Sequence, residues 1–178
     1  GALLKIVETN GTGDTNLTGA LTLPNNTFWQ WITYQDLAIG VNKAASGDNP
    51  VKVSTGAVAA ALGGSPPKAK YIALWENRVW LVSATEPNQL WGSHLGNAEN
   101  WTTGSLAADA ITLDVELDDG DTISGLFATK DALYIKKTKR IYKIVKIDQN
   151  KAITDQTNLR VAIHSQTIGC VSPYSIQP

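Results

Sequence analysis

The chain has 178 residues and a net charge of −1, and 43% of its residues are hydrophobic, which is enough for the core of one ordinary domain. So small a charge favours neither nucleic-acid nor membrane binding through bulk electrostatics. No run of about 18 apolar residues is present, so the sequence predicts no membrane-spanning helix. Its one cysteine, Cys170, excludes an internal disulfide and indicates a reducing compartment. We expect Cys170 to be a small buried apolar residue rather than a reactive thiol.

Two short apolar runs, at 3–7 and 17–23, flank the turn-rich segment 10–14 and predict an N-terminal hairpin. We expect residues 1–23 to form this hairpin and to complete a neighbouring unit of the fold. The chain starts at Gly1 rather than at a methionine, so we expect an excerpt or a processed segment of a longer protein.

A strand–turn–strand unit then recurs three times along the chain. Each copy has a first strand rich in aromatic or β-branched residues, a two-residue polar turn and a second strand. The turns are expected at residues 35–36, 76–77 and 130–131. Their spacing is close to the roughly 40–50 residues of a four-stranded propeller blade.

A single blade cannot bury its own apolar faces, so repeats at this spacing predict blades stacked side by side. No segment of about 12 residues has sustained helical periodicity. The sequence therefore predicts an all-β fold, a partial β-propeller of about three antiparallel blades built from repeated hairpins. We expect residues 24–150 to hold these blades, and residues 151–178 to hold a strand and the beginning of a further blade.

Acidic side chains cluster in and after a strand expected at 111–117, in which apolar and polar residues alternate. The cluster consists of Asp109, Asp114, Glu116, Asp118, Asp119 and Asp121. Calcium prefers six to eight oxygen ligands, but the spacing departs from that of an EF-hand loop. A solvated strand and turn is the favoured interpretation, and we predict no metal site.

Basic side chains follow directly, on the third hairpin and the strand after it. They are Lys130, Lys136, Lys137, Lys139, Arg140, Lys143 and Lys146. Three interpretations remain open: an edge hairpin protected by lysines against aggregation, a contact between subunits of opposite charge, or a contact with DNA phosphates. The residues predicted to contact a subunit or DNA are Lys136, Lys137, Lys139, Arg140, Asp118, Asp119 and Asp121.

Six tryptophans raise the possibility of a carbohydrate site, because sugars stack on indole rings. Most of them fall at strand positions, where propeller blades commonly bury aromatic residues. A core role is therefore favoured for most of them. Trp101 follows a polar loop, so we expect it to be the most exposed and to offer a ligand-binding face.

The sequence gives little support for catalysis, and we predict no catalytic residue and no cofactor. His94 and His164 lie far apart in the chain. Neither a G-x-S-x-G nucleophile motif nor an H-E-x-x-H zinc motif is present.

Several motifs in the middle of the chain resemble a known family. They are Glu-Asn-Arg-Val-Trp-Leu at 76–81, Pro-Asn-Gln-Leu-Trp-Gly-Ser at 87–93, Leu-Gly-Asn-Ala-Glu-Asn-Trp at 95–101, Leu-Asp-Asp-Gly-Asp-Thr-Ile-Ser-Gly-Leu at 117–126 and Lys-Arg-Ile-Tyr-Lys-Ile at 139–144. Together they are similar to the β-propeller part of tailed-phage structural proteins, namely the tail nozzle or tail-tube proteins of short-tailed phages. The resemblance covers roughly residues 28–177.

This resemblance implies a non-enzymatic structural protein of the virion, forming part of the wall of a DNA conduit in a tail nozzle or head-to-tail connector. The implied partners are copies of itself in a ring, usually a hexamer, other tail or connector proteins, and DNA passing through the channel, with no membrane partner. The implied location is the tail or neck of the virion, after assembly in the host cytoplasm. The alternative hypothesis is a glycan- or protein-binding β-domain.

Overall fold

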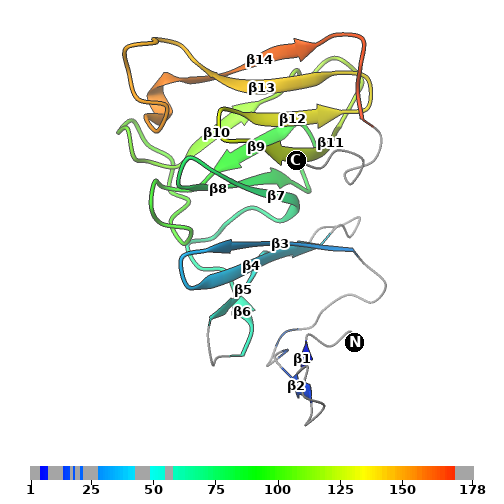
Figure 1. Cartoon of the computed structure of the whole chain (residues 1–178), viewed down its shortest axis with the longest axis vertical. Coiled ribbons are helices and arrows are strands. Elements are labelled where there is room, and N and C mark those ends of the chain that lie inside the picture. The colour runs from blue at the N-terminus through cyan, green and yellow to red at the C-terminus, as the bar shows by residue number, and fades with distance from the viewer. Residues whose placement is uncertain are drawn as a thin grey trace.

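The computed structural model describes residues 5–7, 14–16, 18, 21, 28–42, 49–54 and 58–170. Figure 1 shows three β-sheets stacked along the long axis of the molecule. Each sheet has four antiparallel strands. Within the described residues the only helical segment is a 3-10 turn at Gln156–Asn158. The prediction of an all-β fold built from repeated hairpins is confirmed.

Each sheet is a meander in which consecutive strands are neighbours. The first sheet contains β3 (Trp29–Tyr34), β4 (Leu37–Asn42), β5 (Val51–Ser54) and β6 (Ala60–Ala61). The middle sheet contains β7 (Ala69–Trp75), β8 (Arg78–Ser83), β9 (Gln89–Gly92) and β10 (Ile111–Asp114). The third sheet contains β11 (Ile123–Ala128), β12 (Leu133–Lys137), β13 (Ile141–Lys146) and β14 (Leu159–Ser165).

The three predicted turns join the first two strands of each sheet. Gln35, Glu76 and Asn77 have positive φ angles of 52°, 50° and 56°, which match the twist of tight hairpin connections. In the third sheet the Thr129 N–H donates to the Ala132 carbonyl at 2.9 Å and closes the turn at 130–131. Local turn chemistry therefore fixes the pairing of each hairpin.

Three boundaries differ from the prediction. The N-terminal hairpin pairs β1 (Lys5–Val7) with β2 (Asp14–Asn16), not with 17–23, most of which lies outside the described residues. β10 ends at Asp114 because the chain turns away at Glu116, whose φ is 43°. β14 pairs with β13, so the strand expected within 151–178 completes the third sheet. Residues 171–178, where we expected a further blade to begin, lie outside the described residues.

Two cores hold the stack together. We call the side of a sheet that points to the next sheet in chain order its forward face, and the opposite side its backward face. The forward face of the first sheet packs on the backward face of the middle sheet around Tyr34, Ile39, Val41, Ile72, Val79, Leu81 and Trp101. The forward face of the middle sheet packs on the backward face of the third around Tyr71, Trp75, Trp80, Leu90, Leu133, Ile135 and Tyr142. Burial of apolar area on both sides of the middle sheet is the main favourable contribution to the stack.

Neighbouring sheets contact each other mainly through their early strands. β3 and β4 lie against β7, and β7 and β8 lie against β11. Every residue of β8 is buried, as expected for a strand covered on both faces. In the part of the chain that the structure describes, no helix is long and apolar enough to cross a membrane.

Candidate functional site

The charged residues of the acidic turn and of the third hairpin meet in one cluster. The Lys137 ammonium lies 2.9 Å from Asp119 Oδ1 and donates to the Glu116 carbonyl at 2.7 Å. The Tyr142 hydroxyl donates to Asp119 Oδ2 at 3.2 Å, and Arg140 lies 3.7 Å from the same oxygen. The Lys137 side chain is 0% exposed and that of Asp119 is 7% exposed. Each charge is therefore compensated by a partner in the same chain.

Asp121 holds the turn between β12 and β13. Its carboxylate accepts hydrogen bonds from the Thr138 hydroxyl, from the Thr138 N–H at 3.3 Å and from the Lys139 N–H at 2.9 Å. It also accepts from the Thr122 N–H at 2.9 Å. The Thr138 and Lys139 N–H groups lie at a turn where strand pairing leaves such groups without partners, so the carboxylate acts as a cap.

Both carboxyl groups are held in their ionised form. Burial raises the pKa of Asp119, but the Lys137 ammonium, the Asp121 N–H and the Tyr142 hydroxyl lower it more, so the pKa lies below its usual value. Burial also raises the pKa of Asp121, and the hydrogen bonds from the turn outweigh this effect and lower it. The two groups therefore stabilise the fold as carboxylates.

The acidic and basic segments were expected to contact a neighbouring subunit or DNA, and in this chain they pair with each other through Lys137 and Asp119. Lys136 and Lys137 are buried within the chain, and a subunit or DNA contact of these two lysines stays a prediction. The period-two pattern of β12 places Lys137 on the core side, where Asp119 lies within reach. Asp119 and Asp121 are likewise used inside the chain. Asp118 and Lys139 are exposed and Arg140 is half-buried, and for these three a subunit or DNA contact stays a prediction.

Lys136 points to the other side of β12, onto the forward face of the third sheet. It is 1% exposed, and burial lowers the pKa of its ammonium. Its side chain lines a shallow hollow of about 160 Å³ together with Phe127, Tyr134, Ile141 and His164. Aromatic rings form much of this hollow, with Tyr134 packed edge-on against His164 at a centroid distance of 5.0 Å.

Trp101 does not offer a ligand face. It is 3% exposed and belongs to the core between the first and middle sheets. Its indole N–H donates to the Ala98 carbonyl at 2.9 Å. The expectation of an exposed Trp101 is wrong because the polar loop before it folds back and carries the ring inward.

The exposed tryptophan is Trp31, on the backward face of the first sheet. It is 38% exposed and stacks on Trp29 at a centroid distance of 5.5 Å. Gly40 lies directly opposite Trp31 in the β3–β4 pairing. A Cβ at Gly40 would lie 2.6 Å from the Trp31 ring, so the glycine allows the ring to lie flat on the strand. A glycine opposite a tryptophan is the sequence signal that reasoning from the chain alone missed.

Arg78 is a second feature that the sequence analysis missed. Its buried guanidinium donates to five carbonyl oxygens at 2.7–3.2 Å. These belong to Ser93, Ala107, Ala108, Asp109 and Thr154. Thr154 lies in the β13–β14 connection, so one side chain ties the middle sheet to the third. An arginine at the start of an apolar strand was the only signal.

The residues considered for catalysis do not converge. The His94 ring is hydrogen-bonded to the Leu95 carbonyl at 2.8 Å, whereas His164 packs against Tyr134 in another sheet. Cys170 is buried, as expected. Within the described ranges, no group of three or more histidine, cysteine or carboxylate side chains is placed to hold a metal ion.

Comparison with known proteins adds no identification, because no family model and no curated protein matches the chain.

Proposed function

We propose that this chain is a structural protein whose three sheets are successive blades of a β-propeller in the wall of a phage tail nozzle or head-to-tail connector. The observation that carries this proposal is the repetition of one unit. Three consecutive four-stranded meanders pack face to face, each on the next. Propellers are built by this radial repetition of four-stranded sheets.

Two features of the packing support the propeller. The first is that neighbouring sheets meet through their early strands, β3, β7 and β11, as blades do when their first strands surround a central axis. The second is the way in which the chain leaves each sheet. The Ile123 N–H, at the start of β11, donates to the Pro87 carbonyl in the β8–β9 connection. The Cys170 N–H, after β14, donates to the Lys137 carbonyl beside the β12–β13 turn.

The chain therefore leaves the third sheet as it leaves the middle one, by crossing back to the connection between the second and third strands. Ser124, in β11, also donates its hydroxyl hydrogen to the Cys170 carbonyl and holds this crossing in place. A crossing of this kind leads from the middle sheet into β11. By the same geometry, the second crossing points to a fourth blade.

The charged residues of the cluster stabilise the fold, as expected for a protein that forms a rigid wall. Asp119, Asp121 and Lys137 make contacts within the chain, and Arg78 connects two sheets. Contacts between subunits of a ring would then use other surfaces, among them the exposed Lys139 and Asp118. The assignment to a phage tail rests on the resemblance of the sequence motifs.

The proposal is tested by immunogold electron microscopy of virus particles from the source, with an antibody against this chain. We expect label at the neck or at the tail. Particles that carry capsid label, from a control antibody, but no label for this chain would refute the virion role. The alternative of a glycan-binding module would then be tested on Trp31 rather than on Trp101, since Trp101 is buried.

A further inference from the structure

Two of the three sheets have a β-bulge at the same place in their first hairpin. The first strand carries one extra residue opposite the second strand, Lys70 in β7 and Ser124 in β11. Each stands six residues before the first turn residue, which is Glu76 or Lys130. β3 pairs with β4 without such a shift. Bulges re-aim a side chain and are frequent beside functional sites, so we compared what each extra side chain meets.

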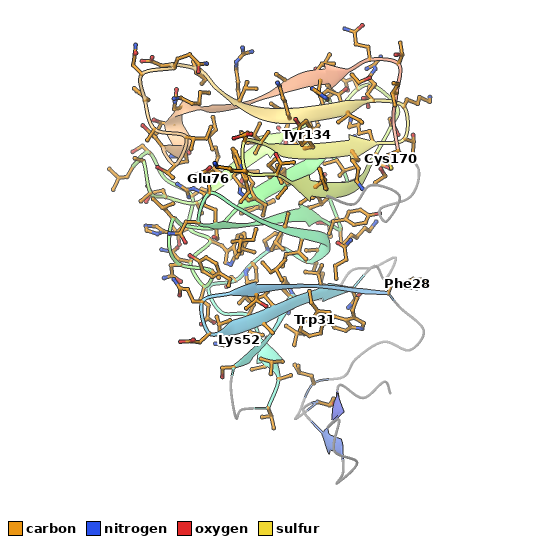
Figure 2. All side chains as sticks on the ribbon, in the orientation of Figure 1. Phe28, Trp31, Lys52, Glu76, Tyr134 and Cys170 are labelled. Carbon is orange, nitrogen blue, oxygen red and sulfur yellow. The ribbon has the colours of Figure 1, made fainter. Side chains whose placement is uncertain are left out.

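In the third sheet the bulge meets the chain as it leaves the sheet. The Ser124 hydroxyl donates to the carbonyl oxygen of Cys170, which follows β14. Figure 2 shows Cys170 at the edge of the stack opposite Glu76, which lies in the β7–β8 turn. The bulge at this edge of the third sheet therefore holds an oxygen atom that accepts a hydrogen bond.

In the middle sheet the bulged residue lines a cavity of about 330 Å³, which we call the bulge cavity. It is lined from β7, from β8 and from the crossing into β11 by Lys70, Tyr71, Val82, Ser83, Thr122 and Ile123. All of these residues except Lys70 and Thr122 are buried. The volume lies at the lower end of the range of about 300–1,000 Å³ for small-molecule sites, which suits a small ligand.

Two polar side chains of the bulge cavity are available to a ligand. Within the described part of the chain, neither the Lys70 ammonium nor the Thr122 hydroxyl has a hydrogen-bond or ion-pair partner. The Ser83 hydroxyl is already used, since it lies 3.2 Å from the Thr85 hydroxyl and accepts from the Glu86 N–H at 3.0 Å. An ammonium and a hydroxyl at a partly buried cavity favour a ligand with negatively charged oxygen atoms.

No carboxylate compensates the Lys70 ammonium among the described residues that line the bulge cavity. The Asp121 carboxylate is close in sequence, but it accepts hydrogen bonds at the β12–β13 turn. Glu86 is exposed and lines a neighbouring hollow with Asp114. The bulge cavity therefore keeps a positive charge that a ligand can neutralise.

We propose that the bulge cavity binds a phosphate group, with the Lys70 ammonium as its ionic partner and the Thr122 hydroxyl as a second donor. A planar carboxylate is best matched by the fork of an arginine, whereas a lysine ammonium is a compact point charge of the kind that binds phosphate. In the middle sheet a phosphate oxygen would take the place that the Cys170 carbonyl oxygen holds in the third. This inference rests on the bulge and its cavity and not on the virion role.

The test is a titration of the full chain with inorganic phosphate at constant ionic strength, followed by proton–nitrogen correlation NMR spectra. We expect the amide signals of Tyr71 and Ile123 to shift and to saturate. Lys70→Met should weaken phosphate binding at least tenfold because it removes a charge-assisted hydrogen bond, and Thr122→Val should weaken it about threefold. Lys130→Met is the matched control, because Lys130 is exposed at the β11–β12 turn and its loss changes the net charge equally. Thermal melts establish that each variant is folded, and Lys70→Gln replaces Lys70→Met if the latter is not.

Three results would overturn the proposal. The first is a titration in which the amide signals do not move or do not saturate. The second is an affinity for phosphate that the loss of the Lys70 ammonium leaves unchanged. The third is an equal loss of affinity in Lys70→Met and Lys130→Met, because it would show attraction by net charge and not binding in the cavity.

A short DNA duplex, added as a competitor, distinguishes the two sources of a phosphate group. Duplex that displaces inorganic phosphate from the wild-type chain supports the proposal with the DNA backbone as the source. Inorganic phosphate that stays bound in the presence of duplex supports it with a free phosphate or a small phosphate ester. Binding of the duplex without any binding of inorganic phosphate overturns the proposal, because the contacts would then lie outside the cavity.

Discussion

Arg78 offers the sharpest test of how the sheets are tied together, through the substitution Arg78→Lys. The guanidinium reaches five carbonyl oxygens, one of which belongs to Thr154 in the β13–β14 connection. Burial lowers the pKa of Arg78, and the nearby charges of Asp109 and Asp155 oppose this effect. A lysine keeps the positive charge but has three N–H donors on one nitrogen, whereas the four N–H donors on Nη1 and Nη2 of Arg78 serve the five carbonyls and its Nε–H has no partner among the described residues.

The expected loss follows from the number of acceptors. At least two of the five carbonyls lose their donor, and a hydrogen bond to a charged group contributes about 1.5–3 kcal/mol. The Ala107 and Ala108 carbonyls keep a second donor, the N–H groups of Gln156 at 3.0 Å and of Leu95 at 2.8 Å. The Ser93 carbonyl belongs to a fully buried residue. We therefore take the lower end of the range and expect Arg78→Lys to lower the free energy of unfolding by about 3 kcal/mol.

Urea denaturation followed by circular dichroism measures this change. Arg160→Lys is the control, because Arg160 is exposed on β14, and surface changes of this kind stay within about 0.5 kcal/mol. A midpoint shift that corresponds to less than about 1 kcal/mol for Arg78→Lys would refute the reasoning, since it would mean that the five carbonyls need no guanidinium.

Three further predictions concern the charged cluster and the first sheet. Lys137→Met should lower the free energy of unfolding by about 3 kcal/mol, because it leaves the buried Asp119 carboxylate without its ammonium partner. In a double-mutant cycle measured by urea denaturation, adding Asp119→Leu should restore much of that free energy. An equal loss of stability with and without Asp119→Leu would contradict the pairing. Because folding lowers the pKa of Asp119 and of Asp121, their contribution is full above the usual carboxyl pKa of about 4 and is lost as the pH falls through the folded-state values. Melting temperatures between about pH 2 and 5 should fall steeply for the wild type and less steeply for Asp121→Asn, and parallel curves would contradict this assignment. Gly40→Val should displace the Trp31 ring, lower the free energy of unfolding by about 1–3 kcal/mol and change the tryptophan fluorescence. An unchanged fluorescence spectrum and an unchanged stability would contradict the stacked geometry.

The hairpins were predictable because their signals are local. Polar residues between apolar strands mark the turns at 35–36, 76–77 and 130–131, and the spacing of these turns corresponds to one sheet each. The boundary at Asp114 was not predictable, because the apolar pattern continues to Leu117 while the backbone turns at Glu116. Alternation reports which residues are apolar and not where strand pairing stops.

The side-chain contacts of the charged cluster and of the tryptophans were not predictable, because they depend on which residues the fold brings close together in space. Lys137 and Asp119 belong to separate charged runs in the sequence. The connection between β10 and β11 passes the end of β12 and places the Asp119 carboxylate 2.9 Å from the Lys137 ammonium. Trp101 follows a polar loop and would be exposed if that loop extended into solvent, but it folds inward. The exposure of Trp31 depends on which end of the stack its sheet occupies, and a sequence pattern does not contain that information.

A cryo-electron microscopy reconstruction of the particles tests the central claim most directly. The account predicts that the three-sheet unit fits density at the neck or tail, in copies arranged as a closed ring around a channel, with further blade density against the face that carries Tyr134 and Lys143. Density that accommodates the unit only away from the channel axis, or none that accommodates it at all, would contradict the role of this chain as part of a conduit wall.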